Sequence, residues 1–296
     1  MFWILRDGIL LVNKPYGVTS FDVVYKIRKI LKIKKVGHCG TLDPIATGVL
    51  PIFFGKATKA IYFIQNTDKE YISKFKFGLK TDTKDITGKI LKEERPFVLK
   101  KELEDVLESF IGEISQKPPM YSAVKVSGVP LYKLARQGKV VERENRNIKI
   151  YSLKCLEFDE QKQEGILKIF CSSGTYIRTL IEDIAFKLNT FGVVLELKRT
   201  IACGFLLKDC VNLDYVEMAE KEEKLEQYVI SIESLFKDFE KIQLSLKDQK
   251  RFLNGVRIEL KLSRKNGEMF SVYGEKFLGI AENENGFLKI VRVFNV

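Results

Sequence analysis

The chain has 296 residues, and 45% of them are hydrophobic, so it can bury a substantial core and is not globally disordered. Fifty lysines and arginines against 39 aspartates and glutamates give a net charge of +11. This surplus favours a polyanionic partner, either nucleic acid or an acidic membrane surface, although a merely solubilising surface is the alternative explanation.

The first twelve residues are apolar but include Arg6 and Asp7, so we expect neither a secretory signal nor a membrane span there. No other apolar run approaches the length of a membrane span. The five cysteines are odd in number, widely spaced and without a CxxC pair, which is typical of reduced thiols rather than of disulfides or a zinc site. These features together predict a soluble cytoplasmic protein with no membrane span.

The N-terminal part of the chain shows clear strand and helix patterns. Residues 8–13 predict a short buried strand, and Ser20 is predicted as the N-cap of the helix that follows. Residues 71–77 alternate between apolar and polar side chains, which predicts a half-buried strand. Residues 99–110 have helical spacing, and Gly112 is a predicted C-terminal stop.

The segment 117–150 has a different composition, because basic residues alternate there with tyrosines after a pair of prolines. We expect a long irregular segment that forms a mobile flap over an RNA strand, with a solvated loop as the alternative. A further helix is predicted to begin near Thr175.

The C-terminal residues predict a small β-rich unit of their own. It would contain a short helix at 246–253 and strands at 269–273, 277–281 and 287–294. We therefore divide the chain into residues 1–238, with an insertion at about 117–150, and residues 239–296.

The stretch 37–48 contains three glycines and a proline, which predicts a shaped loop rather than a regular helix or central strand. An acid in such a loop, here Asp43, is a candidate for chemistry, although a simple Asx-turn before Pro44 explains the spacing equally well. His38 is the single histidine of the chain, so a multi-histidine metal centre is excluded. Neither GxGxxG nor a complete phosphate-binding loop occurs, so we expect no metal and no cofactor.

The sequence GHCGTLDPIATGVLPI at 37–52 resembles the active-site motif of the tRNA pseudouridine-55 synthases, the TruB family. Further motifs of this family follow in the family's order over the first two hundred residues. They are NKP at 13–15, GKATK at 55–59, DKEY at 68–71, GLKTDTKD at 78–85, QKPPMYSAVK at 116–125, LYKLARQG at 131–138, SGTYIR at 173–178 and LKRT at 197–200. Two departures are small: Cys39 replaces another small residue, and Lys198 replaces an arginine.

The resemblance implies that Asp43 is the catalytic residue, either attacking C1′ of the uridine or removing a proton from C2′. It also implies that Arg178 pairs with Asp43, which would keep the carboxylate ionised and oriented. Without the resemblance, Arg178 would be interpreted as an ion pair at the start of a helix.

The resemblance further assigns the residues that would bind the substrate. Tyr71 would stack on the extruded uracil, and Tyr176 and Leu197 would line the base pocket. Lys59 would pair with an acid or a phosphate near the pocket. His38 would insert into the T loop of tRNA and fill the space that extruded bases leave. From the pattern alone, Tyr71 would be an ordinary strand aromatic and Leu197 a core residue.

The fold implied is α+β: a mixed, largely antiparallel sheet with flanking helices, an RNA-contacting insertion and a small β-rich PUA-like domain at the C-terminus. The implied activity is the conversion of uridine 55 in the T stem-loop of tRNA to pseudouridine, by a monomer without an obligatory protein partner. Two alternatives are a synthase acting on another RNA and a non-catalytic RNA-binding or RNA-folding protein.

Overall fold

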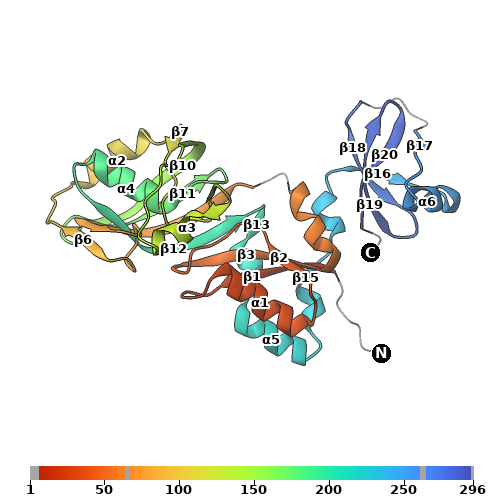
Figure 1. Cartoon of the computed structure of the whole chain (residues 1–296), viewed down its shortest axis with the longest axis horizontal. Helices are drawn as coiled ribbons and strands as arrows, with labels where there is room; N and C mark the ends of the chain where they lie inside the picture. The colour runs from red at the N-terminus through yellow and green to blue at the C-terminus, as the bar shows by residue number, and fades with distance from the viewer. Residues whose placement is uncertain (1–6, 65–66, 261–264, 295–296) are drawn as a thin grey trace.

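The computed structural model describes residues 7–64, 67–260 and 265–294. Two β-sheets form the framework of this part of the chain, and helices pack on the larger one (Figure 1). Residues 1–6 of the predicted non-spanning N-terminus lie outside the described residues. In the described ranges no helix is both long and apolar enough to cross a bilayer.

The larger sheet has eleven strands and is mixed. Only the pairs β1–β14 and β3–β12 are parallel, so the predicted largely antiparallel arrangement is confirmed. Its main path runs β14 (Val211–Asn212), β1 (Gly8–Lys14), β3 (Ala46–Phe54), β12 (Gly192–Ala202), β4 (Lys69–Phe77), β11 (Glu164–Cys171), β10 (Arg146–Asp159) and β7 (Gly112–Gln116). Three short strands pair beside this path: β2 (Val36–His38) with β3, β13 (Phe205–Leu206) with β12, and β15 (Val229–Ile230) with β1.

Strand β12 lies in the middle of the sheet although it comes late in the sequence. It pairs with β3 on one side and with β4 on the other. Leu197 lies opposite Ala46 and Ser73, and Arg199 lies opposite Gly48 and Tyr71. This register brings the start of β3, the start of β4 and the middle of β12 to one place.

Four helices cover the larger sheet because each has one apolar face. They are α1 (Ser20–Leu31), α2 (Lys100–Glu108), α4 (Ile177–Lys187) and α5 (Leu213–Lys221). Leu180, Ile181 and Ile184 of α4 are buried in the main core. The predicted stop of α2 is wrong by a few residues, since the helix ends at Glu108 and Gly112 begins β7.

The N-cap of α1 is Thr19 and not Ser20 as predicted. The Thr19 hydroxyl accepts a hydrogen bond from the Asp22 amide, and Asp22 bonds back to the Thr19 amide, which completes a capping box. The Ser20 hydroxyl instead bonds the backbone of Leu42, accepting from its N–H at 2.8 Å and donating to its carbonyl at 3.1 Å. Ser20 therefore anchors a loop 22 residues further along the chain.

The insertion is more regular than predicted. It contains a two-stranded ribbon of β8 (Lys125–Val126) and β9 (Val129–Pro130), followed by α3 (Leu131–Arg136), and its last residues belong to β10. Leu131 is fully buried, so an apolar contact anchors α3 in a segment whose composition suggested an irregular loop. A second small ribbon pairs β5 (Leu79–Thr81) with β6 (Ile90–Glu93).

The five-stranded C-terminal sheet lies to one side of the larger sheet (Figure 1). Its order is β16 (Glu240–Gln243), β18 (Met269–Tyr273), β19 (Phe277–Glu284), β20 (Phe287–Val293) and β17 (Ile258–Glu259), with α6 (Leu246–Leu253) beside it. Phe236, Phe277 and Phe294 form one apolar cluster with Ile9 and Phe53 of the larger sheet. The two sheets are therefore joined by a shared core.

Candidate active site

The candidate acid Asp43 lies in the loop between β2 and β3. The Ala46 amide donates to the Asp43 carbonyl at 3.0 Å, which closes a turn around Pro44. The prediction of one continuous loop at 37–48 is wrong at both ends, where β2 and β3 already form the sheet. Only glycine fits at position 48 of β3. Its φ is +105°, and a Cβ there would lie 2.1 Å from the Arg199 carbonyl oxygen.

The fully buried side chain of Arg199 binds the backbone of this loop. Arg199 donates from Nε to the Val49 carbonyl at 2.9 Å, from Nη2 to the Gly40 carbonyl at 2.9 Å and from Nη1 to the Thr41 carbonyl at 3.4 Å. Its planar guanidinium presents N–H donors in a fixed fork that reaches all three carbonyls from one side chain. Arg199 belongs to the LKRT motif at 197–200, and its role could not be predicted because the carbonyls that it binds are far away in the sequence.

Lys14 holds the other side of the same loop. Its buried ammonium donates to the carbonyls of Pro15 at 2.8 Å, Val18 at 2.7 Å and Pro44 at 3.5 Å. Burial lowers the pKa of Lys14 to about 8, although the nearby Asp43 carboxylate opposes this effect. Lys14 belongs to the NKP motif at 13–15, to which the resemblance gives no role.

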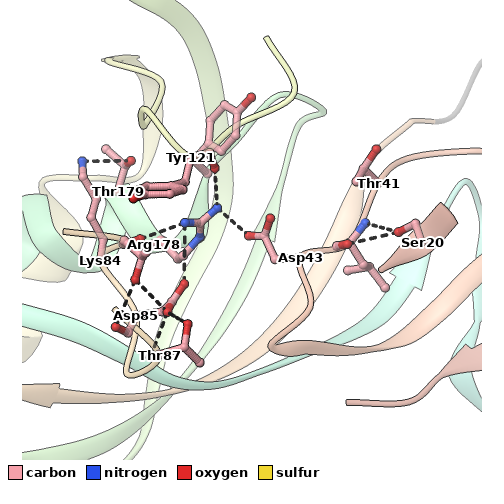
Figure 2. A network of polar contacts seen from close by, with 12 residues as sticks. Ser20, Thr41, Asp43, Lys84, Asp85, Thr87, Tyr121, Arg178 and Thr179 are labelled. Carbon is pink, nitrogen blue, oxygen red and sulfur yellow. Dashed lines mark hydrogen bonds and ion pairs between the residues drawn. The ribbon is translucent and has the colours of Figure 1, made fainter. Parts of the chain in front are cut away.

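Arg178, at the start of α4, forms an ion pair with Asp43, with 2.8 Å between Nη2 and Oδ2 (Figure 2). The same guanidinium donates to the carbonyls of Thr83 at 2.8 Å and Tyr121 at 2.9 Å, and it lies 3.6 Å from the buried Asp85 carboxylate. Arg178 is thus held by two other segments, at residues 83–85 and at Tyr121, and in turn orients Asp43. Since the Arg178 side chain is 4% exposed and that of Asp43 is 36% exposed, the carboxylate keeps one open side. This arrangement favours the paired role over the alternative of a simple Asx-turn.

The open side of Asp43 faces a cavity of about 350 Å³. Tyr71, Tyr176, Arg178 and Leu197 line it together with Asp43, so five of the seven predicted site residues come together. Burial raises the pKa of Tyr71 to about 12, which keeps its phenol protonated at neutral pH. Tyr176 is fixed by the Gln116 side-chain amide, which accepts from its N–H at 2.8 Å and donates to its carbonyl at 3.1 Å.

His38 and Lys59 do not line this cavity. His38 is half-buried at the end of β2, and burial together with the neighbouring Arg199 lowers its pKa, so the imidazole is neutral at neutral pH. Lys59 lies exposed on the 3₁₀ helix η1 (Gly55–Lys59). In the part of the chain that the structure describes, no three His, Cys, Asp or Glu side chains are grouped as a metal ion would require.

Cys39, the small departure from the family motif, contacts Cys203 at 2.9 Å between the two sulfur atoms. The hydrogen bond with Cys203 lowers the pKa of the Cys39 thiol to about 7. Both thiols are free, and their contact packs the start of the Asp43 loop against the end of β12.

The arrangement supports chemistry at a single carboxylate. Asp43 is oriented by an arginine, opens to a cavity with two aromatic walls and one aliphatic wall, and can act as a nucleophile or a base. The aromatic walls suit a planar ring that has left its stack.

Known proteins resemble this chain along nearly its whole length. A family model described as "TruB family pseudouridylate synthase (N terminal domain)" matches residues 28–177. The tRNA pseudouridine synthase B of Clostridium tetani is 44% identical over 292 residues, covering 97% of this chain and 99% of that protein. The protein of the same name from Ralstonia pickettii is 36% identical over 301 residues, with 98% and 94% covered.

Solved structures agree with the fold. The matching chain in the crystal structure of a Cbf5-Nop10-Gar1 complex superposes with a TM-score of 0.71 at 23% identity, covering 98% of this chain and 86% of that one. A similar chain in the structure of an H/ACA RNP bound to a substrate RNA also gives 0.71, at 21% identity. At these identities the likeness shows the shared fold, and it spans the C-terminal sheet as well.

Proposed function

Since the chain belongs to the TruB family of pseudouridylate synthases, we propose that it converts uridine 55 in the T arm of tRNA to pseudouridine. The observation that carries this proposal is the Asp43 carboxylate, paired with Arg178 and open to a cavity walled by Tyr71, Tyr176 and Leu197. The net charge of +11 suits an RNA substrate.

Asp43 begins the proposed reaction at the extruded uridine. In one route its carboxylate attacks C1′, and in the other it removes the C2′ proton; in both, the N1–C1′ bond breaks and its electron pair stays with the uracil. The ring then turns and C5 bonds to C1′. In the first route this displaces Asp43 from C1′, and in the second Asp43 returns the proton to C2′. The C5 proton then leaves. The product is an isomer of the substrate, so no co-reactant is consumed.

The side chains that line the cavity around Asp43 have separate roles in the proposed reaction. Tyr71 would stack on the uracil, and its phenol can donate a hydrogen bond. Because burial raises the pKa of Tyr71 to about 12, almost no phenolate is present at neutral pH to act as a base. Tyr176 and Leu197 would exclude water from the other sides of the ring. We propose that the protein acts as a monomer without an obligatory protein partner.

The remaining assignments extend this proposal along the chain. Residues 1–238 would form the catalytic domain and residues 239–296 a PUA-like domain that lengthens the RNA-binding surface. The insertion at about 117–150 would contact RNA, and it already contributes Ser122 and Ala123 to the cavity. We place the protein in the cytoplasm, where tRNA is modified.

The test is tritium release from a tRNA transcript labelled at uridine C5, followed by mapping of the modified position. A transcript with cytidine at position 55 is the matched control. We expect the native protein to release label from the first transcript and not from the second. Release from both would indicate another target uridine, and binding without release would favour a non-catalytic RNA-binding or RNA-folding protein.

Arg178→Ala should reduce turnover by about 10²–10³-fold while tRNA binding changes little. The variant removes the group that orients Asp43, and such preorganised interactions contribute on this scale. It also leaves the buried Asp85 carboxylate without its cation, so a lower melting temperature is expected. Single-turnover rates below that temperature, with Arg178→Lys as the charge-preserving control, check this; unchanged turnover would remove Arg178 from the site.

His38→Ala should raise KM more than it lowers kcat. The imidazole lies at the start of the Asp43 loop and does not line the cavity, so we expect it to contact RNA around the extruded base rather than the reacting ring. Steady-state kinetics over a range of tRNA concentrations measure both constants. A drop in kcat with KM unchanged would instead indicate a direct part in proton transfer.

A further inference from the structure

Lys69 is a cavity residue to which the reaction described so far gives no task. It begins β4 two positions before Tyr71, and side chains two apart on a strand share a face, so both line the cavity. Its stem packs beside the Asp43 loop, since a Cβ on Gly40 would lie 3.4 Å from the Lys69 Cε. The ammonium is therefore fixed between the loop and the aromatic wall.

The two cations of the cavity differ in their partners. Arg178 faces the two carboxylates of Asp43 and Asp85. Lys69 donates at 2.7 Å to the Thr67 carbonyl, and among the described residues it forms no ion pair with a carboxylate. An ammonium has three N–H donors, so two remain for a ligand in the cavity.

The reaction moves a negative charge toward this unpaired cation. Before the N1–C1′ bond breaks, the charge is on Asp43 and is paired with Arg178. If Asp43 attacks C1′ it becomes a neutral ester, and if it takes the C2′ proton it becomes a neutral acid. In either route the uracil leaves with the N1–C1′ electron pair and carries the charge on its ring nitrogen and carbonyl oxygens.

We infer that Lys69 is a further catalytic residue, which donates a charge-assisted hydrogen bond to a carbonyl oxygen of the uracil anion. This role rests on the proposed function and adds a residue to it. A donor aimed at charge that exists only after bond cleavage stabilises the transition state more than the bound substrate. Lys69 should therefore contribute to the rate of the chemical step and little to tRNA affinity.

The environment of Lys69 makes this contribution dependent on pH. Burial lowers the pKa of Lys69, the cationic Arg199 lowers it further, and the thiols of Cys203, Cys171 and Cys39 oppose the shift. The protonated ammonium is the active form, so activity is retained below the pKa and lost as the pH rises through it. The alkaline loss should begin below the ordinary lysine pKa of 10.5.

The experiment compares Lys69→Met, Lys69→Arg and Lys74→Met with the native protein. Single-turnover rates are measured by tritium release from labelled tRNA, and tRNA affinity is measured by filter binding. Lys74 is the matched control because it lies on the same strand but on the opposite face, paired with Glu164 at 3.4 Å. Native release is established first, so that a failure of the proposed function is seen before Lys69 is judged.

We expect Lys69→Met to lower the single-turnover rate by about 10²–10³-fold with tRNA affinity unchanged. Lys69→Arg should restore most of the rate and move the alkaline loss to higher pH, and Lys74→Met should match the native protein. Weaker binding with an unchanged rate would overturn the inference and place Lys69 on an RNA phosphate. Equal losses in both Lys69 variants with a lower melting temperature would overturn it in favour of a structural role, as would a native rate in Lys69→Met.

Discussion

Replacing Asp43 with asparagine is expected to reduce tritium release by at least about 10⁴-fold, the scale on which loss of a nucleophile or base reduces the rate of other enzymes. Asparagine has nearly the same shape, so the turn around Pro44 and the bond of Ser20 to Leu42 remain. What disappears is the negative charge that attacks C1′ or accepts the C2′ proton. The measurement is single-turnover release with saturating enzyme.

This loss should be confined to chemistry. Asp43 has an open side, and its partner Arg178 keeps Asp85 and the carbonyls of Thr83 and Tyr121, so Asp43→Asn should fold and bind tRNA like the native chain. Asp214→Asn is a suitable control, because that carboxylate pairs with Lys26 on the surface. Release by Asp43→Asn within tenfold of native would exclude Asp43 as the catalytic group.

Arg199→Met is expected to lower the free energy of unfolding by about 3–5 kcal/mol, a large part of the total for a typical domain. The variant leaves the carbonyls of Gly40, Thr41 and Val49 without their donor inside the sheet. Arg199→Lys should recover only part of this energy, since one ammonium cannot reach all three carbonyls in the guanidinium geometry. Urea denaturation followed by circular dichroism measures both variants.

The control for Arg199 is Lys198→Met on the same strand. Lys198 is exposed, so its replacement should change the free energy of unfolding by less than about 0.5 kcal/mol. Where Arg199→Lys still folds, its turnover should also fall, because the loop that carries Asp43 loses its support. An Arg199→Met variant as stable as Lys198→Met would show that water or backbone shifts replace the three hydrogen bonds.

Much of the fold could be predicted from side-chain alternation. Tyr71, Ser73, Phe75 and Phe77 are all buried on one face of β4, as their period of two predicted. The helix at 246–253 and the strand at 269–273 also have the predicted bounds. The bounds of these elements follow from the spacing of apolar side chains along the chain, which can be read from the sequence alone.

The parts that could not be predicted depend on contacts between distant residues. Thr19 and Ser20 are equally good caps by chemistry, and only the position of Leu42 decides which hydroxyl remains free for the helix. Likewise, Gln116 and Arg199 are polar residues inside strands, and their role depends on backbone groups far away in the sequence. The resemblance predicted the pair of Asp43 and Arg178. The hydrogen bonds that hold the Asp43 loop and the Arg178 guanidinium could not be predicted, because they join residues that only the fold brings together.

The central position of β12 has a consequence for the synthesis of the protein. Strands β1 and β3 on one side and β4, β11 and β10 on the other are joined in the sheet only through β12. Between the end of β11 at Cys171 and the end of β12 at Ala202, translation at about 5–20 residues per second takes on the order of a few seconds. During that time the nascent chain holds two half-sheets whose facing edges are unpaired, a state prone to wrong pairing with other chains. Release of a chain before Gly192 would therefore leave a protein without β12, without the complete cavity and with the facing edges of both half-sheets exposed to wrong pairing.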